Sequence, residues 1–220
     1  MAIKDKYASI VTPVCPSLFP TLQDPQVYVP PGSAAEEGDR GKYSCTLILD
    51  PENPDHADFI GKIRDREELL FADEEERASG KIKKGEFFSC LQPEEDKEGN
   101  ETGGLKLKAS MRAGGIIKSG PRKGQSWERD VVVLDHSGRK FEWKEDGEQL
   151  GNGSLIRLET MPFAMTKEKR TRVFMTLVSA QVVRPEWFSP GGSSAFAGQS
   201  VDPEAFEGAG PVDADASGEF

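Results

Sequence analysis

The sequence of 220 residues predicts an all-β protein, rich in short strands and carrying one amphipathic helix. Six or so segments rich in β-branched and aromatic residues are separated by Gly-containing turns, which is typical of a small barrel or sandwich. One longer segment has apolar residues at helical spacing, and residues 189–220 have no periodicity. Together these observations favour an OB-fold-like antiparallel Greek-key barrel with one capping helix and a disordered acidic C-terminal tail.

The first predicted elements are two strands and the helix. The segments VYV at 27–29 and KYSCTLIL at 42–49 are rich in β-branched and aromatic residues, which favours extended structure. A helix is predicted to begin at Asp50 or Asn53, each of which is followed by Pro, and to end at Gly80. One face of this helix is apolar and the other is nearly all charged, so we expect it to pack its apolar face against the core.

The second half of the chain is predicted to hold the remaining strands. Residues 92–103 are polar and are expected to form a turn or a flexible loop. In the segment 104–112, apolar residues alternate with mostly cationic ones, which predicts a half-buried strand with a basic outer face. A Gly-rich basic loop at 114–125 is followed by two predicted hairpins, formed by 127–135 with 139–143 and by 154–163 with 171–183.

Charge is distributed unevenly along the chain. The whole sequence carries 28 basic and 38 acidic residues, which gives a net charge of −10. Residues 102–184 nevertheless hold 16 basic and 9 acidic residues, whereas residues 185–220 hold 7 acidic residues and no basic one. Such an asymmetry is typical of a nucleic-acid-binding surface combined with an acidic tail.

Aromatic residues are interleaved with the cations of this basic block. A positive groove attracts phosphates and flat rings stack on unpaired bases, so the combination indicates a surface for single-stranded nucleic acid. Phe141 and Trp143 share a strand face with Arg139 while Lys140 lies opposite, and the pattern leaves open which face meets DNA. The predicted DNA-binding residues are Tyr43, Lys106, Lys108, Arg112, Lys118, Arg122, Lys123, Trp127, Arg139, Lys140, Phe141 and Trp143.

The sequence contains none of the common catalytic or metal-binding motifs. Cys15, Cys45 and Cys90 are far apart and fit neither a zinc site nor a disulfide framework, which favours a reducing compartment such as the cytoplasm. His56 and His136 neighbour no Ser/Asp or Cys pattern, and no P-loop is present. We therefore expect no enzymatic activity, no catalytic residues, no cofactor and no metal. We also expect no membrane span and no signal peptide.

The last 32 residues, 189–220, consist largely of Gly, Ser, Ala and acidic residues. They cannot bury enough apolar surface to offset the entropy of ordering, so we expect a disordered tail after a DNA-binding domain at 1–188. A terminal ring can enter an apolar pocket of a partner while neighbouring carboxylates meet its cations. The predicted partner-binding residues are Asp213, Asp215, Glu219 and Phe220.

A basic β barrel with aromatic residues, a Gly-rich acidic tail and an acid-Phe ending coincide in this chain. Together they resemble the single-stranded DNA-binding protein of T7-like bacteriophages. The resemblance covers most of the chain. It rests on the order of the similar segments along the sequence more than on any single motif. The segments concerned are GKYSCTLIL (41–49), RDVVVLDHSGRKFE (129–142), LGNGSLIRLETMPFAM (150–165) and TLVSAQVVRPEWF (176–188).

The resemblance implies an OB-fold, a dimer, and a role in protecting and annealing single strands during phage DNA replication, recombination and repair in the infected cell. It also implies that Phe220 and the acidic residues before it contact the phage DNA polymerase and helicase-primase, and that the tail competes with DNA for the groove. This tail is less acidic than is usual in the family, so weaker competition is expected. The alternative is a phage assembly or polymerase accessory protein that acts through its tail without binding DNA, and a nuclease is a third, weaker alternative.

Overall fold

The computed structural model describes residues 7–29, 31–34, 36, 38–77, 86–144, 148–167 and 170–188. The predicted tail at 189–220, with its partner-binding residues Asp213, Asp215, Glu219 and Phe220, lies outside the described residues, as does the predicted helix end at Gly80. No described helix is long and apolar enough to cross a membrane.

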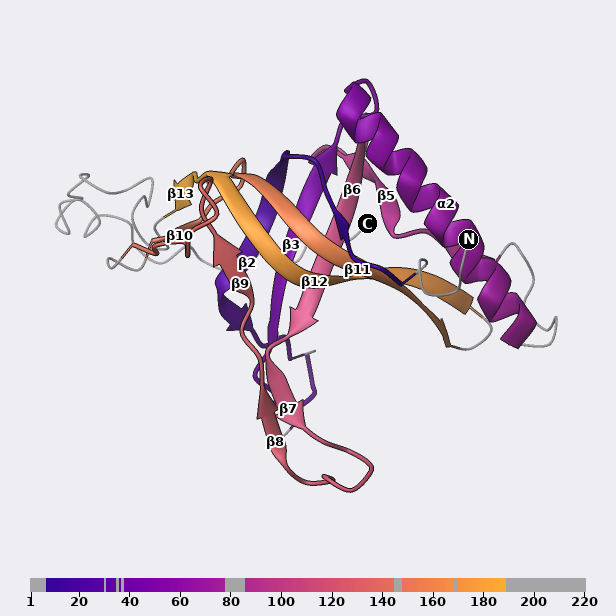
Figure 1. Ribbon diagram of the computed structural model, residues 1–220, viewed down its shortest axis with the longest axis vertical. Helices are drawn as coiled ribbons and strands as arrows, with labels where there is room; N and C mark the ends of the chain where they lie inside the picture. The colour runs from indigo at the N-terminus through magenta and orange to yellow at the C-terminus, as the bar shows by residue number, and fades with distance from the viewer. Residues whose placement is uncertain are drawn as a thin grey trace, which may run out of the picture.

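Five long strands form a closed ring (Figure 1). Around the ring the order is β2, β3, β6, β12 and β11, and β11 closes it by pairing with β2. Four of these five pairings are antiparallel, whereas β6 and β12 run parallel. The strands span β2 (Cys15–Gln26), β3 (Lys42–Leu49), β6 (Glu101–Arg112), β11 (Leu155–Lys167) and β12 (Arg170–Arg184).

The predicted β-rich barrel with one helix is therefore confirmed, with a sheet that is mixed instead of wholly antiparallel. Besides β6, the short strands β4 and β9 also pair with β12 in the parallel direction. The chain between β6 and β12 is a long crossover, which allows the two strands to point the same way. The remaining strands are β1 (Ile10–Val11), β4 (Phe87–Phe88), β5 (Leu91–Glu95), β7 (Gly114–Ile116), β8 (Ser126–Glu128), β9 (Val132–Leu134), β10 (Gln149–Leu150) and β13 (Trp187–Phe188).

Alternation along the strands separates the core from the outer face of the barrel. Leu47 and Leu49 of β3 and Leu107 of β6 are fully buried. The residues between them point outward, and the register places Thr46 opposite Lys108 on that outer face. The basic outer face predicted for 104–112 is therefore present on β6.

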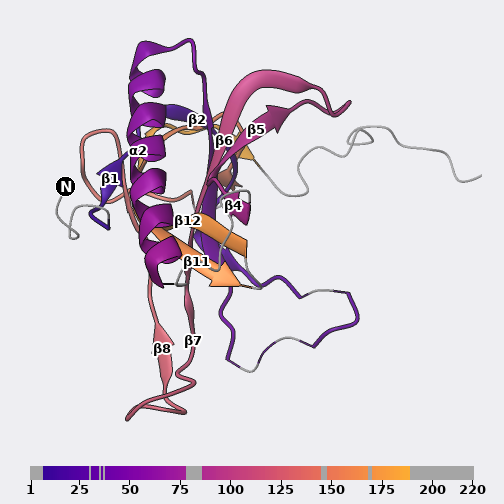
Figure 2. The ribbon, with the colours of Figure 1, turned by 90° about the vertical axis from the view of Figure 1, so that its right-hand side faces the viewer.

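The helix α2 (Pro54–Arg77) lies along one side of the barrel, as Figure 2 shows. Its N-terminus is capped by Asn53, whose Oδ1 accepts hydrogen bonds from the backbone N–H of Asp55 at 3.0 Å and of His56 at 3.4 Å. Its buried apolar residues are Phe59, Ile60, Ile63 and Leu70. The helical spacing in the sequence predicts Ile60, Ile63 and Leu70 on this face, but it also predicts Ala57 and Leu69 there, and both are exposed.

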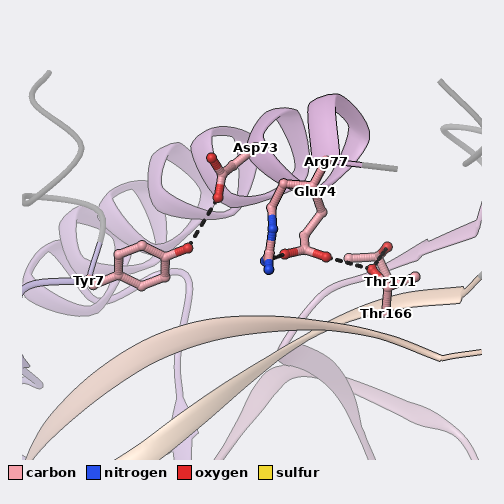
Figure 3. Close-up of polar contacts among 6 residues, drawn as sticks. All are labelled: Tyr7, Asp73, Glu74, Arg77, Thr166 and Thr171. Atoms are coloured by element: carbon pink, nitrogen blue, oxygen red, sulfur yellow. Dashed lines mark hydrogen bonds and ion pairs between the residues drawn. The ribbon is translucent and has the colours of Figure 1, made fainter. Parts of the chain in front are cut away.

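Two buried carboxylates on α2 also face the strands. Glu74 accepts a hydrogen bond from Thr166 Oγ1 at 2.7 Å and pairs with Arg77, and Thr166 in turn contacts Thr171 at 2.9 Å (Figure 3). These bonds hold the end of the β11–β12 hairpin against the helix.

Several predicted elements differ in the structure. The segment 27–29 is not a strand, and β2 ends just before it. The predicted loop at 92–103 is largely extended, because β5 and β6 run into it and leave a turn at 96–100. The predicted strand at 127–135 is divided into β8 and β9, and its partner at 139–143 contributes one bridge, Leu134 with Lys140.

Two turns of the fold share one sequence pattern, Asp-x-x-Gly-x. Asp135 Oδ1 accepts hydrogen bonds from Ser137 N–H at 2.8 Å, Ser137 Oγ at 2.7 Å and Arg139 N–H at 3.0 Å. These bonds favour the charged carboxylate, so the pKa of Asp135 is lowered. Asp96 closes the β5–β6 turn in the same way, and its pKa is lowered as well.

Candidate nucleic-acid interface

A groove of about 370 Å³ lies on the outer face of the barrel where β6 and β12 meet. Lys106 and Lys108 of β6 line it together with Arg172 and Phe174 of β12. The two strands pair in parallel at Met175 with Ala109, so the alternation on each strand turns these cations and this ring to the same side.

The groove continues toward the end of the β11–β12 hairpin as a second hollow of about 300 Å³. Arg172 and Phe174 line both hollows, and Lys167 and Arg170 line the second. The Arg172 guanidinium lies 5.5 Å from the centre of the Phe88 ring. Phe174 stacks on Phe163 with 5.4 Å between the ring centres, so cations and rings alternate here.

In the opposite direction the groove joins a third and larger hollow of about 810 Å³. Lys108 lines both, and the third hollow reaches from the outer face of β3 to β2 and to the ribbon of β10 and β13. Phe19 and Phe188 line it and are exposed. We call the three joined hollows the outer track.

The outer track is strongly cationic although the protein is acidic. Within the described ranges, Glu186 is the one carboxylate among its lining residues, and Arg184 lies 3.5 Å from that carboxylate. A concave surface of one charge sign raises the local concentration of oppositely charged ligands. The lining cations are Lys106, Lys108, Lys167, Arg170 and Arg172.

The helix positions one wall of the track through Glu67. This buried carboxylate accepts hydrogen bonds from Ser89 Oγ, 2.9 Å from both of its oxygens, and from Cys90 N–H at 2.7 Å. Ser89 and Cys90 line the groove beside Lys106. Burial raises the pKa of the Cys90 thiol, and the neighbouring Glu67 raises it further, so the groove wall holds a neutral thiol at pH 7.

The predicted DNA-binding residues fall into three groups in the structure. Lys106 and Lys108 line the outer track, whereas Arg112 lies on the same strand opposite Lys42, outside the lining residues. Lys118, Arg122, Lys123 and Trp127 belong to the arm, the β7–β8 hairpin of residues 114–128, which projects away from the barrel in Figures 1 and 2. The third group is Tyr43, Arg139, Lys140, Phe141 and Trp143.

In this third group, two predicted stacking residues are corrected. Tyr43 is only 6% exposed, because β3 turns it into the core, and its hydroxyl donates to Asp130 at 3.2 Å. Burial and this hydrogen bond raise the pKa of Tyr43. Phe141 is 7% exposed and packs against Trp143 and Trp187, with ring centres 4.8 and 5.9 Å away. Neither Tyr43 nor Phe141 offers a ring face to a base.

The burial of Phe141 does not fit one of the two arrangements that the sequence left open, in which Phe141, Trp143 and Arg139 face DNA together. Phe141 belongs to the core and Trp143 packs against it, whereas Arg139 and Lys140 are both exposed. These two cations lie at the turn after β9 and are not among the lining residues of the outer track.

Several lining residues were missed in the sequence. The pattern RTRVF at 170–174 alternates, and strand periodicity places Arg170, Arg172 and Phe174 on one face, so this signal was available. No such signal marks Phe19, because a bulge in β2 sets its direction. The missed residues are Phe19, Phe88, Lys167, Arg170, Arg172, Phe174 and Phe188.

Solved structures share this fold. The structure of gp2.5, a single-stranded DNA-binding protein encoded by bacteriophage T7, superposes with a TM-score of 0.57 at 18% identity, covering 89% of this chain and 96% of that chain. The single-stranded DNA-binding protein from bacteriophage Enc34 is similar as a C-terminal truncation, with a TM-score of 0.53, 14% identity and coverage of 81% and 86%. Its complex with single-stranded DNA gives a TM-score of 0.51 at 14% identity, covering 81% and 87%.

These comparisons confirm, at the level of the fold, the resemblance that the sequence predicts, and the barrel is OB-fold-like. No family model and no curated protein matches the chain. Among the described residues, no group of three or more His, Cys, Asp or Glu side chains is placed to hold a metal ion.

Proposed function

We propose that this protein binds single-stranded DNA along the outer track and carries out no chemistry on it. The observation that carries the proposal is the joined cationic groove over β3, β6 and β12. In OB-folds the face formed by the second and third barrel strands, here β3 and β6, is the one that binds oligonucleotides. The similar structures are those of single-stranded DNA-binding proteins, and one of them is a complex with single-stranded DNA.

The lining chemistry favours an unpaired strand. Lysine and arginine side chains neutralise phosphates without regard to sequence, and aromatic rings stack on the faces of bases. In a duplex the base faces are already stacked on one another, so the exposed rings of the outer track have no partner there. Phe174, Phe88 and Phe163 supply rings between the cations at the hairpin end.

A salt titration of binding to oligo-dT tests the proposal. Affinity falls with salt, with a log–log slope of about −0.7 for each phosphate contact on a single strand. The double variant Lys106→Ala/Lys108→Ala binds more weakly, and its slope is shallower by about 1.4. The matched control is Lys62→Ala, which removes an α2 lysine paired with Asp58 at 2.6 Å. Absence of binding by the unaltered protein would favour the alternative, an accessory protein that does not contact DNA.

We also propose the wider role that the resemblance implies. The protein protects single strands during phage DNA replication, recombination and repair, as a homodimer. The acidic tail at 189–220 recruits the polymerase and helicase-primase through Asp213, Asp215, Glu219 and Phe220. Deletion of residues 213–220 is expected to leave affinity for oligo-dT unchanged or higher and to weaken polymerase binding. A loss of DNA affinity in that variant would contradict this role.

A further inference from the structure

The third hollow of the outer track lies between β2, the outer face of β3 and the β10–β13 ribbon. At about 810 Å³ it is larger than the two hollows that continue from it. Two hydrogen bonds fix the turn at 151–153 to β2, and the second of them joins two lining residues of the hollow. Gly153 N–H donates to Ser17 O at 2.8 Å, and Phe19 N–H donates to the Asn152 side-chain oxygen at 2.6 Å.

Phe19 is unusual in two respects. Its side chain is 73% exposed, and its φ of +48° makes it the one non-glycine with a positive φ among the described residues. A bulky residue rarely adopts this conformation, and its ring gains little from packing in return. Strained backbone of this kind tends to persist where function requires it.

A bulge in β2 produces this geometry. The register between β2 and β3 shifts between Leu18 and Thr21, and Thr21 Oγ1 replaces a backbone group by accepting from Ser44 N–H at 3.0 Å. An extra residue in one strand re-aims its side chain, and here it presents Phe19 at the edge of the hollow.

A second exposed ring, that of Phe188 on β13, also lines the hollow. The neighbouring Trp187 is already engaged, because it stacks on Phe141 and the Lys144 ammonium lies 4.8 Å from its ring centre. Phe19 and Phe188 are therefore the rings available to an occupant of the hollow.

The polar groups of the hollow suit a base better than a phosphate. Its walls carry the amides of Gln149 and Asn152, which offer both donors and acceptors, and the carboxylate of Glu186, which repels phosphate. The cation Lys108 stands where the hollow joins the groove, in position to meet the phosphate beside a base that has entered.

We infer that this hollow is a nucleobase pocket, in which an unpaired base of the DNA strand bound along the outer track stacks on Phe19, with Phe188 as the second exposed ring of the lining. The inference rests on the proposed function and adds a fixed stacking site to it. Because stacking needs only a ring face and the amides are adaptable, the pocket accepts any base.

The variant Phe19→Gly tests the pocket. Glycine adopts a positive φ at no steric cost, so the fold is retained and the melting temperature is not lowered. Affinity for oligo-dT falls about tenfold, which corresponds to about 1.4 kcal/mol. The salt slope stays unchanged, because no phosphate contact is lost. Phe19→Tyr retains the ring and the affinity. The matched control Tyr7→Ala, which removes a ring beside α2, has no effect on affinity.

A second ligand separates base stacking from other effects. On an oligonucleotide of the same length made of abasic residues, wild type and Phe19→Gly bind equally. A tenfold difference that persists on the abasic strand would mean that Phe19 contacts the backbone, and equal affinities on oligo-dT would mean that it contacts nothing. Either result would contradict the nucleobase pocket. Salt-dependent binding of wild type to oligo-dT would still support the proposed function. If wild type binds neither strand, both are overturned.

Discussion

A buried residue of the helix can fix the position of residues on the outer surface of the barrel through hydrogen bonds. Glu67 is the clearest example, because its carboxylate accepts from Ser89 and Cys90, and these residues line the groove beside Lys106. A buried donor that loses its acceptor costs roughly 1–3 kcal/mol. The position of one wall of the outer track therefore depends on the Glu67 side chain, which is not itself one of the lining residues.

We expect Glu67→Ala to lower the free energy of unfolding by about 1–3 kcal/mol, because Ser89 Oγ and Cys90 N–H lose their acceptor. Glu67→Gln keeps an acceptor oxygen and is expected to lose less. Urea denaturation measures both, and Glu68→Ala, on the exposed side of α2, serves as the control. A stability change in the control as large as that of Glu67→Ala would refute this role.

The turn at Asp135 gives a prediction for pH. Hydrogen bonds from Ser137 and Arg139 hold the pKa of Asp135 in the folded state below the ordinary value for an aspartate, so its stabilising effect is present above that ordinary value and is lost as the pH falls through the folded-state pKa. Asp135→Ala is expected to melt at a lower temperature than wild type at pH 7, with a difference that shrinks below pH of about 4. Thermal melts from pH 7 to pH 3 check this, with the exposed Glu142→Ala as the control. A difference that is constant with pH would contradict it.

Among the elements, the arm is the one that the sequence describes least well. Its Gly-rich, loop-like composition does not predict the pairing of β7 with β8. The loop before β3 contacts this ribbon through two ion pairs, Arg40 with Glu128 at 2.5 Å and Lys118 with Glu36 at 3.1 Å. Gly114 is required at its base, since a Cβ there would lie 2.6 Å from the backbone oxygen of Trp127. The tip cations Arg122 and Lys123 are thereby held away from the barrel.

We expect Arg122→Ser/Lys123→Ser to leave binding of a short oligo-dT that fills only the outer track nearly unchanged. On a long strand, which can also reach the arm, the same variant is expected to weaken binding and to make the salt slope shallower by up to about 1.4. Titrations with the two lengths measure the difference. An equal loss of affinity for the short and the long oligo-dT would mean that the tip of the arm contacts DNA within the outer track, which would contradict this prediction.

How well an element could be predicted depended on whether local sequence decides it. The strand at 42–49 and the helix at 54–77 each bury one face, so the apolar residues recur at a regular spacing in the sequence. Both elements were predicted at nearly their observed positions. The strand β2 was missed because Pro16, Pro20 and Pro25 conceal it. Proline is tolerated there since the register of β2 with β3 is interrupted by bulges.

The candidate site was harder to predict than the fold. Lys106 and Lys108 were found because one strand's alternation exposes them, whereas Arg172 and Phe174 join them only through the pairing of β6 with β12. Tyr43 and Phe141 were placed wrongly because an aromatic ring on a strand fits a core and a binding face equally well. The sheet register decides between the two, and it is a property of the whole chain.

At the scale of the whole molecule, a strand bound along the outer track contacts several barrel strands at once. A ligand that binds only the folded state stabilises it by RT ln(1 + [L]/Kd), about 2.7 kcal/mol at a hundredfold excess over Kd. We expect oligo-dT to raise the melting temperature with increasing concentration, and added salt to cancel the shift. The Lys106→Ala/Lys108→Ala variant should show a smaller shift, and an unchanged melting temperature for wild type would contradict the proposal.

The parallel pairing of β6 with β12 has a consequence for how the protein comes into being. Residues 109 and 175 meet there, so a growing polypeptide that has emerged only as far as β10 carries two of the lysines and none of the arginines of the track. In such an unfinished chain the outer track is incomplete. If the track binds single-stranded DNA as proposed, this capacity arises late during synthesis, when β12 pairs with β6.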